Sequence, residues 1–159
     1  MKMKRMTMVA VVAATVGATG CAGSTIGGTQ IKDTKENREI LRVVETYHEA
    51  LESLDADAVL ALVSPDYYED HGNTDAADDF DYEALAQTIH TNFDRTKTMQ
   101  VDFRVDAVEV KKNDAFAEVY YDIRAHNDYP SGTKWERTTD RTRLRFRREG
   151  ERWRIVAGL

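Results

Sequence analysis

Cysteine is nearly absent from this sequence, since Cys21 is the only one among 159 residues. A disulfide framework and a cysteine-rich zinc site each need several cysteines, so the sequence excludes both. Long hydrophobic runs are lacking as well. The most apolar stretch, Met6–Val16, has 11 residues and includes Thr7 and Thr15, whereas a helix that spans a bilayer needs about 20 apolar residues. This stretch is therefore too short to be a membrane-spanning helix.

Motifs that hold metals or cofactors are missing too. The chain has four histidines, but it has no HExxH motif, no histidines four residues apart and no glycine-rich phosphate loop. The acid-rich segment at residues 69–81 lacks the spacing of an EF-hand loop. No arrangement of Ser, His and Asp indicates a nucleophilic triad. We therefore expect neither a metal nor a cofactor.

Positive charge is in short supply. The 28 Asp and Glu outnumber the 22 Lys and Arg, which gives a formal net charge of −6. Residues 1–20 hold three of these cations and no acid, so the rest of the chain carries a net charge of −9. We do not expect such an acidic chain to bind nucleic acid or to be attracted to anionic lipid headgroups.

The N-terminus has the layout of a secretory signal peptide. Two lysines and an arginine precede the apolar stretch Met6–Val16, and the small residues Ala18–Gly20 end directly at Cys21. This ending resembles the lipobox of bacterial lipoproteins, although Ala18 stands where that family usually has Leu. The resemblance implies that residues 1–20 are removed and that Cys21 carries a diacylglyceryl group and an acyl chain such as palmitate. Several acyl chains give a stable membrane anchor.

The lipid anchor implies a location in the cell envelope. Ala22, rather than Asp, follows the cysteine, and this resemblance suggests the outer membrane, facing the periplasm, if the host has one. Gly, Ser and Thr dominate the next residues without periodicity, so we predict that residues 21–34 are the lipidated cysteine and a flexible tether. Residues 35–159 are predicted to be one ordinary domain.

Three helices are predicted in the first half of this domain. Residues 36–54 carry apolar side chains at every third or fourth position. Residues 55–65 predict a short helix that Asp55 or Asp57 caps and Pro65 stops. Residues 76–93 offer a third helix with one apolar face.

From Met99 onward the apolar period changes to two, which is typical of strands. The alternation slips by one residue at Asp106–Ala107 and so predicts a β-bulge. Further strands are predicted at residues 115–125, 135–148 and 153–157, with a loop at 127–133 and a turn at 148–151. Helices followed by a meander of long, bent strands indicate an α+β fold, in which the helices pack on one face of an antiparallel sheet.

The order of these elements resembles the nuclear transport factor 2-like superfamily, and its bacterial SnoaL-like branch in particular. The resemblance rests on a tyrosine in the first helix, the segment LDADAVLALVSPDYYED and the ending EGERWRIVAGL, and it covers about residues 36–159. It implies a cone-shaped fold in which three N-terminal helices pack on a strongly curved antiparallel sheet, with a pocket at the wide end. The superfamily contains isomerases and dehydratases as well as members that only bind a ligand or a partner, so the fold alone does not choose among these functions.

Binding without catalysis is the function that we favour at this stage. The domain is expected to bind a small hydrophobic ligand in its pocket, or a protein partner in the envelope. Such pockets are mainly apolar, with a few polar groups that orient the ligand. The expected ligand-binding residues are Tyr47, Leu51, Tyr68, Tyr82, Ile89, His90, Phe103 and Tyr121.

The alternative is an acid–base enzyme of the isomerase or dehydratase kind. The resemblance to ketosteroid isomerases implies Asp70 as the general base and Tyr47 as the hydrogen-bond donor to a developing oxyanion. It also implies an acid that faces inward from a late strand. Asp140 faces inward by the period of two, but Thr142 occupies the position that matches best. That mismatch favours the binding function.

Arginines alternate along the segment RTRLRFR at residues 141–147. We expect them to face away from the helices and to pair with Glu118 and Asp122 on the preceding strand. The alternative is a homodimer or partner surface, because members of this superfamily often associate through the sheet.

Overall fold

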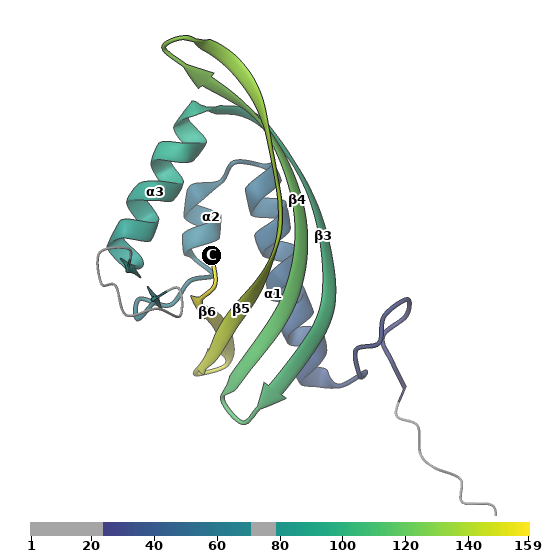
Figure 1. The fold of residues 1–159 in the computed structure, drawn as a ribbon. Coiled ribbons are helices and arrows are strands. Elements are labelled where there is room, and N and C mark those ends of the chain that lie inside the picture. The colour runs from purple at the N-terminus through teal and green to yellow at the C-terminus, as the bar shows by residue number, and fades with distance from the viewer. Residues whose placement is uncertain (1–23, 71–78) are drawn as a thin grey trace, which may run out of the picture.

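Helices and a curved antiparallel sheet are the two parts of the fold. The computed structural model describes residues 24–70 and 79–159. Its elements are α1 (Lys35–Glu52), α2 (Ala56–Leu60), β1 (Tyr68–Glu69), β2 (Phe80–Asp81), α3 (Tyr82–Arg95), β3 (Thr96–Lys111), β4 (Asp114–Tyr129), β5 (Gly132–Glu149) and β6 (Arg152–Ala157). Figure 1 shows that the sheet of β3 to β6 bends strongly around the helices, which lie on its concave side. The short β1–β2 ribbon separates α3 from the first two helices, so the helices do not form one continuous N-terminal block.

Helix α1 forms where an apolar stripe follows a capping residue. The Thr34 hydroxyl accepts a hydrogen bond from the Asn37 N–H at 3.1 Å, which satisfies one of the free donors of the first turn. Ile40, Val44 and Leu51 are buried along one face. Burial of this stripe in the core stabilises the helix more than its intrinsic propensity does.

Helix α2 is shorter than its sequence suggests. Its cap is Asp55, one of the two residues predicted, but it ends at Leu60, well before Pro65. The tertiary structure explains the early end. The Ser64 N–H donates to the Ile155 carbonyl at 2.8 Å and the Ile155 N–H donates to the Leu62 carbonyl at 2.9 Å. The chain after α2 therefore pairs with the edge of β6 instead of continuing as a helix.

Helix α3 also starts later than predicted. Its first residue is Tyr82 and its cap is Asp81, whose carboxylate accepts from the Ala84 N–H at 2.9 Å. Phe80 and Asp81 are extended because they pair with β1. Residues 76–78 of the predicted helix lie outside the described residues.

The long strands follow the predicted alternation. The register between β3 and β4 shifts between Val105 and Ala107, so the predicted bulge is confirmed. The predicted loop at residues 127–133 is wrong, because β4 continues to Tyr129 and β5 resumes at Gly132. Hydrogen bonds from Asn127 and Tyr129 to the Glu136 carboxylate, both 2.7 Å, hold the two strands together up to the turn.

The two faces of β5 differ as expected. Leu144 and Phe146 face the core and are buried, while the arginines between them are exposed on the convex face. Arg143 donates to Glu118 at 2.5 Å, which confirms one of the predicted cross-strand pairs. Asp122 is paired instead with Arg137, at 2.5 Å.

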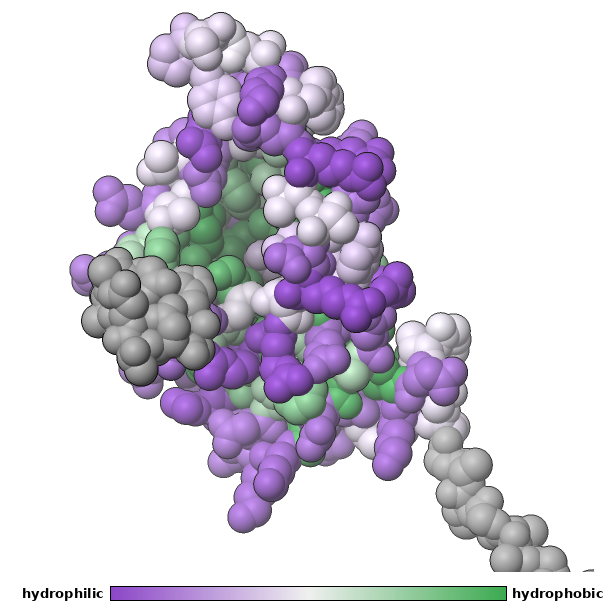
Figure 2. Space-filling view, viewed as in Figure 1, coloured by the Kyte–Doolittle hydropathy of each residue, from purple (hydrophilic) through white to green (hydrophobic). Residues whose placement is uncertain are grey.

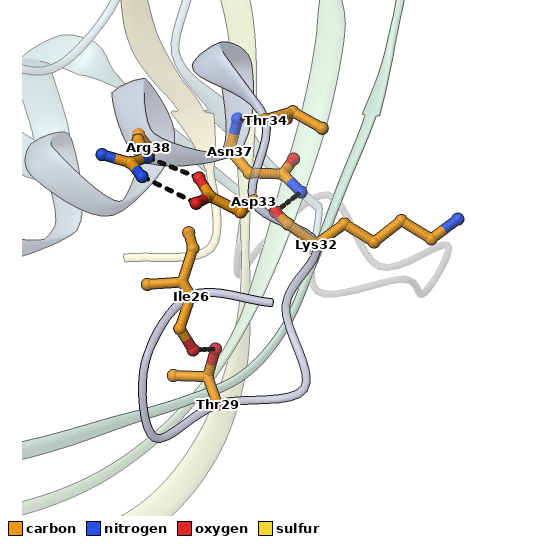
Figure 3. A network of polar contacts seen from close by, with 7 residues as sticks. All are labelled: Ile26, Thr29, Lys32, Asp33, Thr34, Asn37 and Arg38. Atoms are coloured by element: carbon orange, nitrogen blue, oxygen red, sulfur yellow. Dashed lines mark hydrogen bonds and ion pairs between the residues drawn. The ribbon is translucent and has the colours of Figure 1, made fainter. Parts of the chain in front are cut away.

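Residues 24–34 belong to the segment that we predicted to be a flexible tether, and they make defined contacts in the structure. Thr25 and Lys32 form a β-bridge, and Ile31 is buried. Two polar contacts join the segment to α1 (Figure 3): the Asn37 side chain donates to the Lys32 carbonyl at 2.9 Å, and Arg38 donates twice to the Asp33 carboxylate. These contacts count against a tether over this range, while residues 21–23 lie outside the described residues.

The signal peptide at residues 1–20 and Cys21 lie outside the described residues. In the part of the chain that the structure describes, no helix is long and apolar enough to cross a membrane.

Candidate functional site

A cavity of about 590 Å³ opens on the concave face of the sheet. Figure 2 shows hydrophobic side chains gathered in the hollow beside α3, with hydrophilic side chains along its edges. Ligand pockets are typically clefts of roughly 300–1,000 Å³ with this kind of lining. The cavity is lined by Tyr47, Phe103, Val119, Tyr121, Ile123, Thr138, Asp140, Arg141, Thr142, Leu144, Gly158 and Leu159.

The strands place these side chains by their period of two. Val119, Tyr121 and Ile123 alternate along β4 and point to the concave side together. Asp140 on β5 is the direct partner of Tyr121 across the sheet, and Thr138 is the partner of Ile123. The polar wall of the cavity therefore lies on β5 and its apolar wall on β4.

Tyr47 reaches the cavity from α1. Its ring packs against Phe103 with the ring centroids 5.7 Å apart. Burial, followed by the proximity of Tyr67 and Tyr121, raises the pKa of Tyr47 well above that of a free tyrosine. The group therefore remains a hydroxyl at physiological pH. Among the described residues its hydroxyl has no hydrogen-bond partner, so it is available to a bound ligand.

Tyr121 and Asp140 stand side by side at the polar wall. Burial raises the pKa of Tyr121, and the nearby Asp140 carboxylate raises it further. One oxygen of Asp140 accepts from the Arg141 backbone N–H at 2.7 Å, which fixes the orientation of the carboxylate. Asp140 is exposed, so a ligand in the cavity can reach it. The cavity thus offers two phenol hydroxyls and one carboxylate above an apolar floor.

Three of the eight expected ligand-binding residues meet here: Tyr47, Phe103 and Tyr121. Asp140, expected to face inward, joins them. The other expected residues lie elsewhere. Leu51 and Ile89 pack in the core, and Tyr82 is partly buried against it.

The two remaining expected residues are on the surface. Tyr68 is half exposed and its hydroxyl bonds to Asp79. His90 is exposed on α3, with its ring nitrogen 3.9 Å from the Asp57 carboxylate. Neither residue lines the cavity.

The expected base Asp70 lies directly after β1. It is not among the described residues that line the cavity. Its charge acts instead on Tyr68, whose pKa is raised first by the hydrogen bond to Asp79 and to a lesser degree by Asp70. The structure therefore places Asp140, and not Asp70, in the cavity that Tyr47 lines.

Several lining residues were missed from the sequence. Val119 and Ile123 share the strand face of Tyr121, and Thr138 shares that of Asp140, so the alternation could have revealed them. No alternating pattern indicated Gly158 and Leu159 as lining residues, because they follow the last strand.

Other hollows lie outside the concave face. One of about 460 Å³ lies among the arginines of the convex face, and one of about 810 Å³ lies between residues 30–37 and β3. Neither contains a tyrosine. Across residues 24–70 and 79–159, no three His, Cys, Asp or Glu side chains form a group that could hold a metal ion. Most of the acid-rich segment at 69–81 falls outside these ranges.

A strongly curved antiparallel sheet that encloses a cavity against helices defines the nuclear transport factor 2-like class of domains. The chain belongs to the family of SnoaL-like domains, whose pattern matches residues 40–158. No curated protein matches the chain.

Solved structures agree on the fold. A conserved protein from Planctomyces limnophilus has a TM-score of 0.66 and 16% identity, covering 77% of this chain and 92% of its own. A ketosteroid isomerase-like protein from Erwinia carotovora atroseptica has a TM-score of 0.64 and 16% identity, covering 79% and 95%. A proposed dehydratase of the NTF2-like family from Streptomyces avermitilis has a TM-score of 0.63 and 14% identity, covering 77% and 92%. At these identities the likeness establishes the fold.

Proposed function

We propose that this SnoaL-like domain binds a small hydrophobic ligand in the cavity on the concave face of its sheet. The observation that carries the proposal is the composition of the cavity wall. Phe103, Val119, Ile123 and Leu144 provide an apolar surface, and the Tyr47 hydroxyl has no partner among the described residues. A hydroxyl without a protein partner, on the wall of a largely apolar cavity, can donate a hydrogen bond to a ligand that binds there.

The residues that line the cavity also indicate the class of ligand. An apolar body matches the floor, and a hydroxyl or amine at one end matches the acceptor oxygens of Asp140 and Thr138. We expect a molecule of modest size, because the cavity holds about 590 Å³.

Binding can be tested with matched tyrosine variants. The full chain, in lipid nanodiscs, is titrated with N-phenyl-1-naphthylamine, and energy transfer from its two tryptophans reports the bound probe. Tyr121→Ala should weaken binding about ten-fold or more, because a large buried contact is lost. Tyr120→Ala is the control, since Tyr120 lies on the convex face beneath Arg104. Failure of the wild-type chain to bind, or equal weakening by both variants, would refute the proposal.

We also propose that the domain is held at the cell envelope by lipid on Cys21. The supporting observation is the sequence of residues 18–21, which resembles a lipobox. We expect the outer membrane, facing the periplasm, if the host has one. Labelling with a fatty acid should mark the wild-type protein and not Cys21→Ala, and fractionation should move the variant to the soluble fraction. An unlabelled wild-type protein would end this part of the proposal.

A second candidate function is acid–base catalysis of the isomerase or dehydratase kind. The observation that favours it is the presence of Asp140, Tyr121 and Tyr47 around one cavity, where a carboxylate can move a proton and a phenol can donate to an oxyanion. The neighbours named as ketosteroid isomerase-like and as a proposed dehydratase support the same idea. In this version the base is Asp140, because Asp70 is not part of the lining.

Deuterium exchange separates the two functions. A bicyclic enone is incubated with the protein in heavy water, and exchange of the hydrogens next to its carbonyl is followed by NMR. Catalysis by Asp140 requires exchange that Asp140→Asn abolishes and Asp70→Asn does not. Absence of exchange in a wild-type chain that binds the enone would leave binding as the function.

A protein partner or a second copy on the convex face remains a prediction. The arginines there are already paired with Glu118, Glu69 and Asp114. Pairing within the chain accounts for their charge without a partner. Sedimentation of the full chain would detect a dimer.

A further inference from the structure

The last two residues of the sequence form part of the cavity wall. Gly158 and Leu159 follow β6, and both line the cavity together with Tyr47. Leu159 also packs against the main hydrophobic core. Figure 1 shows this end of the chain lying between the helices and the concave face of the sheet.

Side chains from two separate parts of the fold, the segment at residues 67–69 and strand β5, hold these two residues. The Glu69 carboxylate accepts from the Gly158 N–H at 2.6 Å, and the Thr142 hydroxyl donates to the Gly158 carbonyl at 2.8 Å. The Tyr67 hydroxyl accepts from the Leu159 N–H at 3.2 Å and donates to the Leu159 carbonyl at 3.4 Å. The N–H and the carbonyl of both residues are thus occupied.

The backbone conformation of Gly158 and its close approach to β5 both require glycine at this position. Its φ is +100°, a conformation that side chains rarely adopt. A Cβ at this position would lie 2.3 Å from the Arg143 carbonyl oxygen, so the chain passes β5 closer than any other residue would allow. This close approach places Leu159 where it both lines the cavity and packs against the core.

The position of these residues along β5 defines one end of the cavity. Gly158 is bonded to Thr142, and beyond Thr142 the concave face of β5 is filled by the buried Leu144 and Phe146. In the other direction the face opens at Asp140 and Thr138. A ligand that places its polar end at Asp140 therefore directs its apolar end toward Leu159.

We propose that Leu159, held in place by Glu69, Tyr67 and Thr142, sets the length of the apolar ligand that the cavity accepts. This inference rests on the proposed ligand-binding function. Leu159 acts as the end wall, so a smaller side chain deepens the cavity and a larger one shortens it. Each additional methylene that becomes buried strengthens binding about four-fold.

The test uses straight-chain primary alcohols of increasing length, which displace the naphthylamine probe from the full chain in nanodiscs. Wild type should show an affinity that rises with length and then levels off. Leu159→Ala should move the plateau to alcohols longer by about two or three carbons, and Leu159→Phe should move it to shorter ones. Val156→Ala is the matched control, because Val156 lies on β6 and does not line the cavity. It should leave the plateau where it is.

The outcomes distinguish a failure of this inference from a failure of the proposed ligand-binding function. No probe binding by wild type would refute ligand binding itself. Wild-type binding with the same plateau in all four chains would overturn the role of Leu159 alone. If Leu159→Ala does not fold, as judged by circular dichroism, Leu159→Phe still decides the question, because an unchanged plateau in that variant overturns the inference as well.

Discussion

The concave face of β5 has a closed half and an open half. Leu144 and Phe146 are each 1% exposed, whereas Thr138 and Asp140 on the same face are exposed. The difference comes from what flanks the strand. β6 pairs only with Arg145–Glu149, so the closed half has a strand on either side and the open half has β4 alone. The same alternating pattern of side chains therefore gives buried core where β6 flanks β5. It gives an open cavity where β5 has only β4 beside it.

Polar groups hold the hairpin beyond the open half. The Glu136 carboxylate accepts from Asn127 and Tyr129, both at 2.7 Å, and from Lys134 at 3.0 Å. This cluster joins β4 and β5 near their turn, and none of its four residues lines the cavity.

The largest expected effect belongs to the closed half. Phe146→Ala should lower the free energy of unfolding by about 3–5 kcal/mol, because it leaves a void in close-packed core. Denaturant titration of the full chain measures the loss. Thr138→Ala on the open half is the comparison and should cost about 0.5 kcal/mol or less. Equal losses would show that the two halves do not differ in packing.

A smaller loss is expected at the boundary between the halves. Gly158→Ala should destabilise the fold by about 1–3 kcal/mol, because alanine resists this backbone conformation and its Cβ meets the Arg143 carbonyl. Ligand affinity should fall together with stability, since Leu159 is displaced. Gly27→Ala is a suitable control, because a Cβ there has nothing within 4 Å. A fully stable Gly158→Ala chain would contradict the close approach.

The polar cluster around Glu136, near the turn between β4 and β5, should make the free energy of unfolding depend on pH in acid. Hydrogen bonds from Tyr129, Asn127 and Lys134 lower the pKa of Glu136 to about 2 from an ordinary value of 4.5. Because the folded pKa is depressed, the stability from Glu136 is fully present above pH 4.5 and is lost as the pH falls toward 2. The difference in unfolding free energy between wild type and Glu136→Gln should therefore shrink over that interval. A difference that stays constant down to pH 2 would count against the network.

The smallest effect is expected on the convex face. Arg147→Ala should change the free energy of unfolding by well under about 1 kcal/mol, because its pair with Asp114 spans 3.7 Å and both side chains are exposed. Thermal unfolding at low and high salt would measure this. A loss comparable to that of Phe146→Ala would mean that the faces of β5 have been assigned the wrong way round.

The sequence predicted local structure better than it predicted the site. An Asp cap on α2, the slip at Asp106–Ala107 and the outward-facing arginines of β5 were all predicted, because each depends on neighbours close in the chain or on a period. Element ends were less well predicted. α2 ends early because of Ile155, which is far away in the sequence.

The cavity was predicted in part. Tyr47, Phe103, Tyr121 and Asp140 were named and do meet, because each lies on the inward face of a periodic element. His90 was named for lying beside an apolar stripe and is exposed instead. A residue at the border of a stripe can face either way, and only the packing of α3 decides which.

The sequence by itself determined the order of the main helices and long strands, though not where they end, and which side of each long strand faces inward, since these properties follow from caps and from periods of two and about 3.6 residues. The tertiary structure alone decided where the inward side is filled and where it is hollow. That choice depends on the shortness of β6 against the length of β5 and on the placement of Gly158 and Leu159 by Glu69, Tyr67 and Thr142. Contacts between residues so far apart in the chain leave no local pattern, because they arise only when the sheet curves and brings them together.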